Sequence, residues 1–298
     1  MRVVLLSLVL GLSAPAHSDL SKTIAALSAK INERPSAELY FQRALEYRAL
    51  REKHHTVEDL RRALKLDPGF QEAKFALAEE LGKSDEALRL AIQLANGPGK
   101  IETTYRASLL LIRVHRLREE NQEALQLCRR LAEKSENLRQ DDSELDLLHA
   151  EILLDLKLPT EAATVLRAAW RRTKSIVARN NWIDAALTAG QTEETLPLIE
   201  HELRTSRLRS SWLIRRARAL LVLKQAKAAR ADLHSALLEI NSRLNPRQPD
   251  LTLVSDRGLI HALMGNPGLA KRDLATLQKS LLPQSSYRLL NDQLDGSR

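Results

Sequence analysis

The sequence is poor in the residues that stabilise small secreted domains or build β-sheets. It has one cysteine in 298 residues, so no intramolecular disulfide can form. Aromatic residues make up only 3% of the chain, and no stretch alternates β-branched and polar residues long enough to predict a strand. Leu, Ala, Arg, Glu and Lys dominate instead, and these residues favour helix almost throughout. The single Cys128, between Leu127 and Leu131, is expected to be a small buried apolar residue and not a nucleophile.

Catalytic and cofactor motifs are also missing. The chain has no glycine-rich phosphate loop, no cysteine pair for zinc and no Gly-x-Ser-x-Gly turn. His201-Glu202 is followed by Leu203-Arg204-Thr205, so the second histidine of a zinc-protease motif is absent. We therefore expect no enzyme, no catalytic residue, no metal or cofactor, and no small-molecule substrate.

Long apolar runs are absent except at the N-terminus. Val3 to Leu12 is apolar apart from Ser7 and Gly11, follows Met1-Arg2 and precedes Ala14-Pro15-Ala16. This order is typical of a secretory signal peptide, here over 1–18, cleaved after Ala16 or Ser18. The run is about half the roughly 20 residues that a membrane span needs, and the alternative is an uncleaved N-terminal anchor. We expect an exported protein, periplasmic or secreted.

A short submotif recurs along the rest of the chain: a small residue stands four residues before a leucine or another apolar residue. The seven copies start on average about 36 residues apart, a period typical of helical solenoids. Small residues let two helices approach closely, so we expect these seven anchor residues to be buried. They are Thr56, Ala87, Ala124, Ala162, Thr195, Ala229 and Ala270.

The first repeat carries the clearest pattern, formed by Tyr40, Ala44, Tyr47, Leu60, Ala63 and Pro68, with Thr56 at the small position. These residues resemble the tetratricopeptide repeat, a helix–turn–helix unit of 34 residues. The resemblance implies an all-α fold, a right-handed α-solenoid of about seven helical hairpins over 37–281. We expect a capping helix over 19–36, a polar tail over 282–298 with at most a short helix at 287–294, and left-handed Gly190 and Gly265 at helix ends. Unit lengths vary, so a helical repeat of another family is the alternative.

The resemblance also implies a binding site. In tetratricopeptide repeat proteins, side chains on the first helix of each hairpin line a concave groove that binds extended peptides. Carried onto this sequence, the groove includes Arg106, Arg113, Arg116, Glu151, Asn180, Asp184 and Arg218, with Asp155 beside Glu151. Asn180 and Arg218 are residue types that can hold a peptide backbone or carboxylate. The Lys and Asn set of the family's carboxylate clamp is not reproduced, so a chaperone tail is not the expected ligand.

Positive charge is unevenly distributed. The formal net charge is +8, and residues 203–231 contain no Asp or Glu. A candidate basic patch in this segment consists of Arg204, Arg207, Arg209, Arg215 and Arg216. In one interpretation, arginine stems cover apolar helix surface while Trp170, Trp182 and Trp212 fill gaps between repeats. In the other, the patch binds an anionic partner.

Three hypotheses follow from these patterns. The leading one is a non-enzymatic scaffold of a bacterial-type envelope or the secreted space, which binds a protein or peptide in the groove. The alternative is a factor that binds a polyanion or an anionic lipid surface through 203–231. The third is an enzyme with an unrecognised site. Export argues against nucleic acid as the anion.

Overall fold

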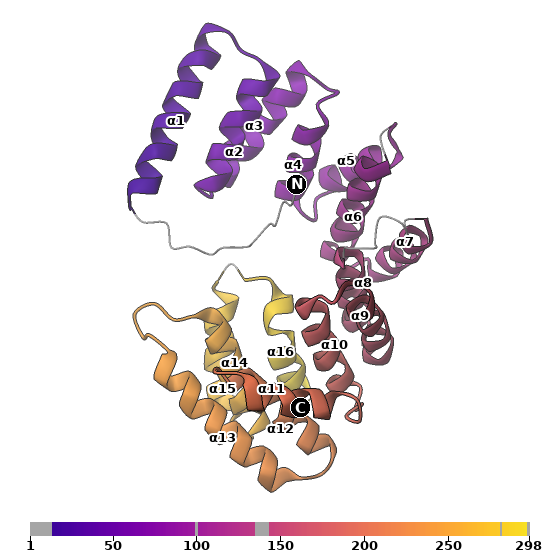
Figure 1. Ribbon diagram of the computed structural model, residues 1–298. Helices are drawn as coiled ribbons and strands as arrows, with labels where there is room; N and C mark the ends of the chain where they lie inside the picture. Colours follow the sequence, from indigo (N-terminus) through magenta and orange to yellow (C-terminus); the bar gives the residue numbers. More distant parts are fainter. Residues whose placement is uncertain (1–13, 99–100, 135–142, 281, 297–298) are drawn as a thin grey trace. The chain divides into compact units, whose positions relative to one another are not determined.

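The computed structural model describes residues 14–98, 101–134, 143–280 and 282–296, with side chains from Asp19 onward. These residues form helices joined by short connections, and they contain no β-strand (Figure 1). The all-α prediction is thereby confirmed. The sequence predicted one repeat array, whereas the structure divides into two compact units, Met1–Arg139 and Gln140–Arg298.

The first unit contains a leading helix and three helical hairpins. Successive helices pack side by side along the chain, and each hairpin also contacts the next one. The helices are α1 (Ala14–Glu33), α2 (Ala37–Ala49), α3 (Lys53–Leu66), α4 (Gln71–Leu81), α5 (Asp85–Asn96), α6 (Ile101–Leu117) and α7 (Asn121–Lys134).

The second unit contains four hairpins and a C-terminal segment. Together with the first unit, this gives seven hairpins in the described part of the chain, as the seven anchors predict. The helices are α8 (Glu144–Asp155), α9 (Pro159–Thr173), α10 (Ile176–Thr188), α11 (Thr195–Thr205), α12 (Ser210–Val222), α13 (Ala226–Arg243), α14 (Leu251–Leu263), α15 (Pro267–Gln278), the 3-10 turn η2 (Gln284–Tyr287) and α16 (Arg288–Asp295).

The seven anchor residues are buried. Thr56 and Thr195 are 1% exposed, and the five alanine anchors are fully buried. Small side chains at these points let the helix backbones approach closely, and the neighbouring leucines, such as Leu60 and Leu233, fill the remaining space. Cys128 is buried as well. The expectation that the repeated submotif serves packing is therefore confirmed.

Two predicted helix ends are confirmed. Gly190 and Gly265 both have positive φ, at 77° and 79°, and each is the second residue after the end of its helix, α10 or α14. In this conformation the backbone can leave a helix while its last carbonyls stay hydrogen-bonded, and glycine adopts it without strain.

The fifth hairpin departs from the regular pattern. Helix α10 packs mainly on the preceding α9 and contacts its own partner α11 only slightly. Trp170 of α9 and Trp182 of α10 stack with ring centroids 5.1 Å apart, which explains the close α9–α10 contact. Trp182 and Trp212 are buried, so these tryptophans fill gaps between helices, as the structural interpretation of the basic segment expects.

The N-terminal helix packs against α2 and buries Leu27 and Ile31. It begins at Ala14, five residues before the capping helix that we expected. Residues 1–13 of the proposed signal peptide lie outside the described residues, so the signal peptide stays a prediction. Among the helices that are described, none is long and apolar enough to cross a membrane.

The end of the chain differs from the frayed polar tail that we expected. Residues 284–295, which we call the C-terminal segment, form η2 and α16 and pack against α14 and α15. Tyr287, Leu290 and Leu294 are buried there. Their spacing of three and four residues places them on one side of the segment, which explains why an otherwise polar sequence is ordered.

Three hairpins share one salt bridge that the sequence analysis missed. In each, an arginine of the first helix donates two hydrogen bonds to an aspartate 16 residues later in the second helix. The arginine stands 13 residues before the anchor and the aspartate three residues after it. The pairs are Arg43–Asp59, Arg216–Asp232 and Arg257–Asp273.

Candidate functional site

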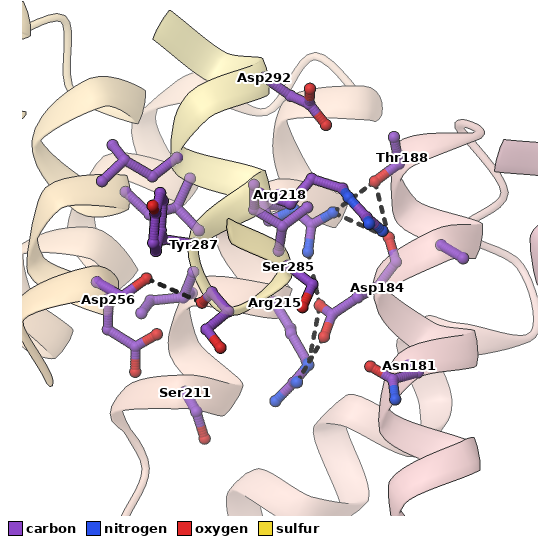
Figure 2. Close-up of a pocket in the computed structure, with 18 of the residues that line it drawn as sticks. Asn181, Asp184, Thr188, Ser211, Arg215, Arg218, Asp256, Ser285, Tyr287 and Asp292 are labelled. Atoms are coloured by element: carbon purple, nitrogen blue, oxygen red, sulfur yellow. Dashed lines mark hydrogen bonds and ion pairs between the residues drawn. The ribbon is translucent and has the colours of Figure 1, made fainter. Parts of the chain in front are cut away.

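The second unit has a cavity of about 310 Å³ on the face formed by the first helices of its hairpins, α8, α10, α12 and α14. We call this surface the first-helix face. Asn181 and Asp184 come from α10, Ser211 and Arg215 from α12, and Asp256 from α14 (Figure 2). The C-terminal segment lines the remaining side of the cavity. Residues from four hairpins and the end of the chain therefore meet at one place.

Asp184 is the centre of the charged cluster in this cavity. Arg215 donates to its carboxylate from Nε at 3.1 Å and from Nη2 at 2.6 Å. Arg218 donates to the same carboxylate from Nη1 at 2.7 Å, and from Nη2 to the Asp184 carbonyl and to Thr188 Oγ1, both at 3.0 Å. One carboxylate thus accepts bonds from two guanidinium groups of the next hairpin, which fixes α12 against α10.

The ionisation of this cluster is set by burial and by the pairing. Burial alone raises the pKa of Asp184, but the two arginines outweigh it and hold that pKa below its usual value. Burial, with repulsion from Arg215, lowers the pKa of Arg218, and Asp184 opposes this. The hydrogen bonds from Arg215 and Arg218 to the Asp184 carboxylate make this cluster a network of ion pairs between α10 and α12.

Asp256 behaves differently. Burial raises its pKa to about 6, because the nearby Arg215 offsets only part of the cost of removing the carboxylate from water. The negative charge of Asp184 adds to the increase. Asp256 is therefore the group in the cavity that changes charge close to neutral pH, and it can receive a hydrogen-bond donor or a cation.

Hydroxyl groups and apolar side chains surround the charged cluster. Ser255 Oγ donates to the Ser286 carbonyl at 3.3 Å, so this hydroxyl is bonded to the backbone and not to a base. Within the described ranges, no group of three or more His, Cys, Asp or Glu side chains is placed to hold a metal ion. The lining of the cavity thus combines charged side chains, hydroxyl groups and apolar side chains.

A polypeptide segment already lies against this face. Arg288 of α16 donates to Asp155 of α8 at 2.8 Å, and Lys157, in the turn after α8, donates to Asp292 of α16 at 2.6 Å. Leu290 packs against α14 at Gly258, where an added Cβ would lie 2.7 Å from Leu290 Cδ2. The C-terminal segment therefore touches the first and last hairpins of the unit.

The structure brings together only some of the predicted groove residues. Asp184 and Arg218 meet in the cavity, but they bond to each other and leave Arg218 little capacity for a peptide. Asn180 lies outside the cavity lining, and its side-chain oxygen is buried with no hydrogen-bond partner among the described residues. Glu151 is partly buried on α8. Arg218 therefore bonds within the protein, to Asp184 and Thr188, and direct binding of a peptide by Arg218 stays a prediction.

The other predicted groove residues belong to the first unit. Arg106 and Arg113 are exposed on α6, and Arg116 is partly buried there. The Arg106 guanidinium lies 5.4 Å from the centre of the Phe75 ring, so it partly covers an aromatic side chain of its own unit.

The predicted basic patch separates into two groups. Arg204, Arg207 and Arg209 are exposed, and none forms an ion pair with a described residue. Arg215 and Arg216 are bonded to Asp184 and Asp232. These two do not belong to an available basic surface, because each neutralises a carboxylate on a neighbouring helix. Arg215 also lies over the Trp212 ring, at 4.9 Å from its centre.

Sequence reasoning missed the contribution of the chain's end to the site. The signal was present as the spacing of Tyr287, Leu290 and Leu294, which marks a short amphipathic helix. The sequence did not indicate where that helix packs, because the contact between Arg288 and Asp155 joins residues 133 positions apart.

No protein-family model and no curated protein matches the sequence. Among solved structures, a tetratricopeptide repeat protein from Parabacteroides merdae is similar, with a TM-score of 0.61 and 15% identity over 87% of this chain and 97% of that one. The human IFIT1 dimer with PPP-AAAA gives a TM-score of 0.46 and 16% identity, over 88% of this chain and 69% of that one. The tetratricopeptide repeat domain of P58(IPK) gives 0.31 and 17%, over 95% and 96%. The first similarity shows the fold: the chain is an α-helical solenoid of the tetratricopeptide repeat type.

Proposed function

We propose that this protein is a non-enzymatic scaffold that binds a protein or peptide, and that the first-helix face of the second unit is the binding surface. The hairpin architecture supports this, because a stack of repeats presents the first helices of successive hairpins as one extended surface. The cavity supports it further, since its lining comes from four successive hairpins.

The observation that carries the proposal is the docking of the C-terminal segment. That segment is held by ion pairs, by a bond to its backbone carbonyl and by buried leucine and tyrosine side chains. These are the kinds of contact by which a groove recognises a helical peptide. A face that accommodates one polypeptide segment in this way has the chemistry to accommodate another.

A bulky substitution tests the assignment without breaking an ion pair. Asn181→Trp places a large side chain at an exposed position in the cavity lining. Ser235→Trp is the matched control, since Ser235 is exposed on α13 and does not line the cavity. We expect cross-linked capture from the native host to lose specific proteins with Asn181→Trp and to retain them with Ser235→Trp, at equal helical content by circular dichroism. If both variants capture the same proteins equally, the first-helix face of the second unit is not the binding surface.

Export is a separate part of the proposal. It is supported by the N-terminal pattern of Arg2, a short apolar run and Ala14-Pro15-Ala16. N-terminal sequencing of the protein recovered from cell fractions tests it directly. A mature chain in the periplasm or the medium that begins at His17 or Asp19 supports export with cleavage, whereas a cytoplasmic chain that retains Met1 contradicts it.

Binding of a polyanion or an anionic lipid surface is the second candidate. The exposure of Arg204, Arg207 and Arg209 favours it, although the pairing of Arg215 and Arg216 reduces the available charge. Replacing the three exposed arginines with glutamine should then abolish binding to phosphatidylglycerol vesicles, and binding by the unaltered chain should fall steeply with salt. Binding that does not respond to salt would contradict this candidate.

A further inference from the structure

The contacts of the C-terminal segment with α8 form a reciprocal pair of charges. Asp155 accepts from Arg288, and Lys157 donates to Asp292 four residues later. The first pair is partly buried, with side chains 26% and 15% exposed, whereas Lys157 is 72% exposed. The order of charges on α16, basic and then acidic, therefore matches the order on and after α8, acidic and then basic. This match fixes the direction in which the helix lies.

Apolar contacts fix the depth of the same helix. Leu290 lies between the two charged residues and is 1% exposed, and Tyr287, just before Arg288, is 5% exposed. Gly258 on α14 has no side chain, and this absence lets Leu290 approach the helix backbone. The pattern that the face recognises therefore has four residues. They are the aromatic Tyr287, the basic Arg288, Leu290 and the acidic Asp292.

The segment is short, and it depends on docking to stay helical. Helix α16 has eight residues, and a helix of that length is marginal in water unless it is docked. The Lys157–Asp292 ion pair has an exposed member, so it contributes little to stability. The buried side chains of Tyr287, Leu290 and Leu294 hold the segment on the face, and its short link to α15 keeps its local concentration there high. A ligand with the same pattern can therefore compete with it.

We propose that the C-terminal segment is a built-in occupant of the first-helix face, and that a partner binds there by displacing it with a helical segment of the same pattern: aromatic, basic, leucine and acidic at relative positions 0, 1, 3 and 5. This inference rests on the proposed function and deepens it, because it specifies the chemistry of the partner and explains why the face is covered before the partner arrives.

The test uses the full-length chain and a fluorescent synthetic peptide of residues 283–296. In the double variant Arg288→Glu with Asp292→Lys, like charges face Asp155 and Lys157, so the built-in segment is repelled while the face itself is unchanged. We expect the labelled peptide to bind this variant at least about tenfold more tightly than it binds the wild-type chain, by fluorescence anisotropy.

Two controls make the result specific. The double variant Arg230→Glu with Glu161→Lys has the same net charge change at exposed positions away from α16, and it should bind the peptide like the wild type. We call the variant Arg288→Glu with Asp292→Lys the opened variant. A charge-reversed peptide, which carries the same two substitutions, should not bind it. Hydrogen exchange of α14 amides reports whether the variant keeps its fold. If the α14 amides lose protection, the variant Asp155→Lys with Lys157→Glu is used instead. It repels the native segment, and its charges match those of the charge-reversed peptide, which then serves as the probe.

Equal peptide binding by the wild-type chain and the opened variant would overturn the proposal, and so would the absence of binding to an opened variant that is folded. These outcomes are distinct from failure of the proposed function. If Asn181→Trp reduces partner capture but release of the C-terminal segment does not change it, the scaffold function is supported. The proposal that the segment is a built-in occupant is then wrong. If the labelled peptide binds but no partner is captured from the host, the proposal that the segment is a built-in occupant is supported and the proposed scaffold function is not.

Discussion

The Arg216 guanidinium donates two hydrogen bonds, of 2.7 and 2.6 Å, to the Asp232 carboxylate, from the first helix of the sixth hairpin to the second. The carboxylate is 9% exposed. The same bridge in the first and seventh hairpins shows that it belongs to the repeat and not to the binding site.

Removal of this bridge should destabilise the fold. Arg216→Ala leaves a buried carboxylate with no counter-charge, and we expect a loss of about 1–3 kcal/mol in the free energy of unfolding. Urea denaturation followed by circular dichroism measures it. Arg207→Ala, at an exposed position with no ion pair to a described residue, should change stability by less than about 0.5 kcal/mol. A similar effect of both substitutions would show that the bridge does not stabilise the hairpin.

Asp184 should contribute more to stability than Asp232, because its carboxylate pairs with two arginines, Arg215 and Arg218. Asp184→Asn should cost about 3–5 kcal/mol, since Arg215 and Arg218 would then be left partly buried without a negative charge. Thermal or urea unfolding tests this. Asp85→Asn is the control, because the Asp85 side chain is 80% exposed and its ion pair with Arg118 should contribute little to stability. A loss of under about 1 kcal/mol at Asp184 would mean that water screens the cluster and that it does not fix α12 against α10.

Gly258 tests the packing of the C-terminal segment. In Gly258→Ala the new Cβ would lie 2.7 Å from Leu290 Cδ2 and 3.1 Å from Asp273 Cβ, so the Leu290 side chain must move and its packing on α14 is disturbed. We expect a loss of about 1–3 kcal/mol and faster hydrogen exchange in α16. Gly268→Ala meets no atom within 4 Å and lies at the start of α15, so it should be neutral or slightly stabilising. Unchanged exchange in α16 for Gly258→Ala would contradict the close contact.

Asp256 gives the second unit a specific pH dependence. Its pKa of about 6 lies above the unfolded value of 3.8, so the folded chain binds more protons between these two pH values. The contribution of Asp256 to the free energy of unfolding therefore decreases as pH rises through this interval. Asp256→Asn removes that contribution, and the variant should become more stable than the wild type by roughly 1–3 kcal/mol at pH 7. Parallel stability curves for the two proteins from pH 4 to 7 would contradict the assignment.

The repeat architecture was predictable because its signal is local. Ala162, Ala229 and Ala270 each stand a fixed distance before an apolar residue, and close helix packing demands small residues at just those points. The division into two units was not predictable from the same signal, because the anchors continue in phase from Ala124 to Ala162 across the boundary. The weak contact between α10 and α11 was also missed, and so was the stacking of Trp170 on Trp182 that accompanies the close contact between α9 and α10.

The candidate site was predictable only in part. The repeat register placed Asp184 and Arg218 on the same face, and both line the cavity. It did not show that they pair, because the partners lie in different hairpins and pairing depends on the distance between those hairpins. The role of the C-terminal segment depends on a contact between Arg288 and Asp155, which no periodic pattern encodes.

The most direct test of the account is hydrogen exchange of the full-length wild-type chain with and without a millimolar excess of unlabelled peptide 283–296. If the first-helix face is a binding surface covered by the chain's own end, the peptide displaces that end. The amides of Leu290 to Leu294 should then lose protection while those of α14 keep theirs. Unchanged protection of α16 in the presence of bound peptide, or loss of protection in α14 and α16 together, would contradict the account.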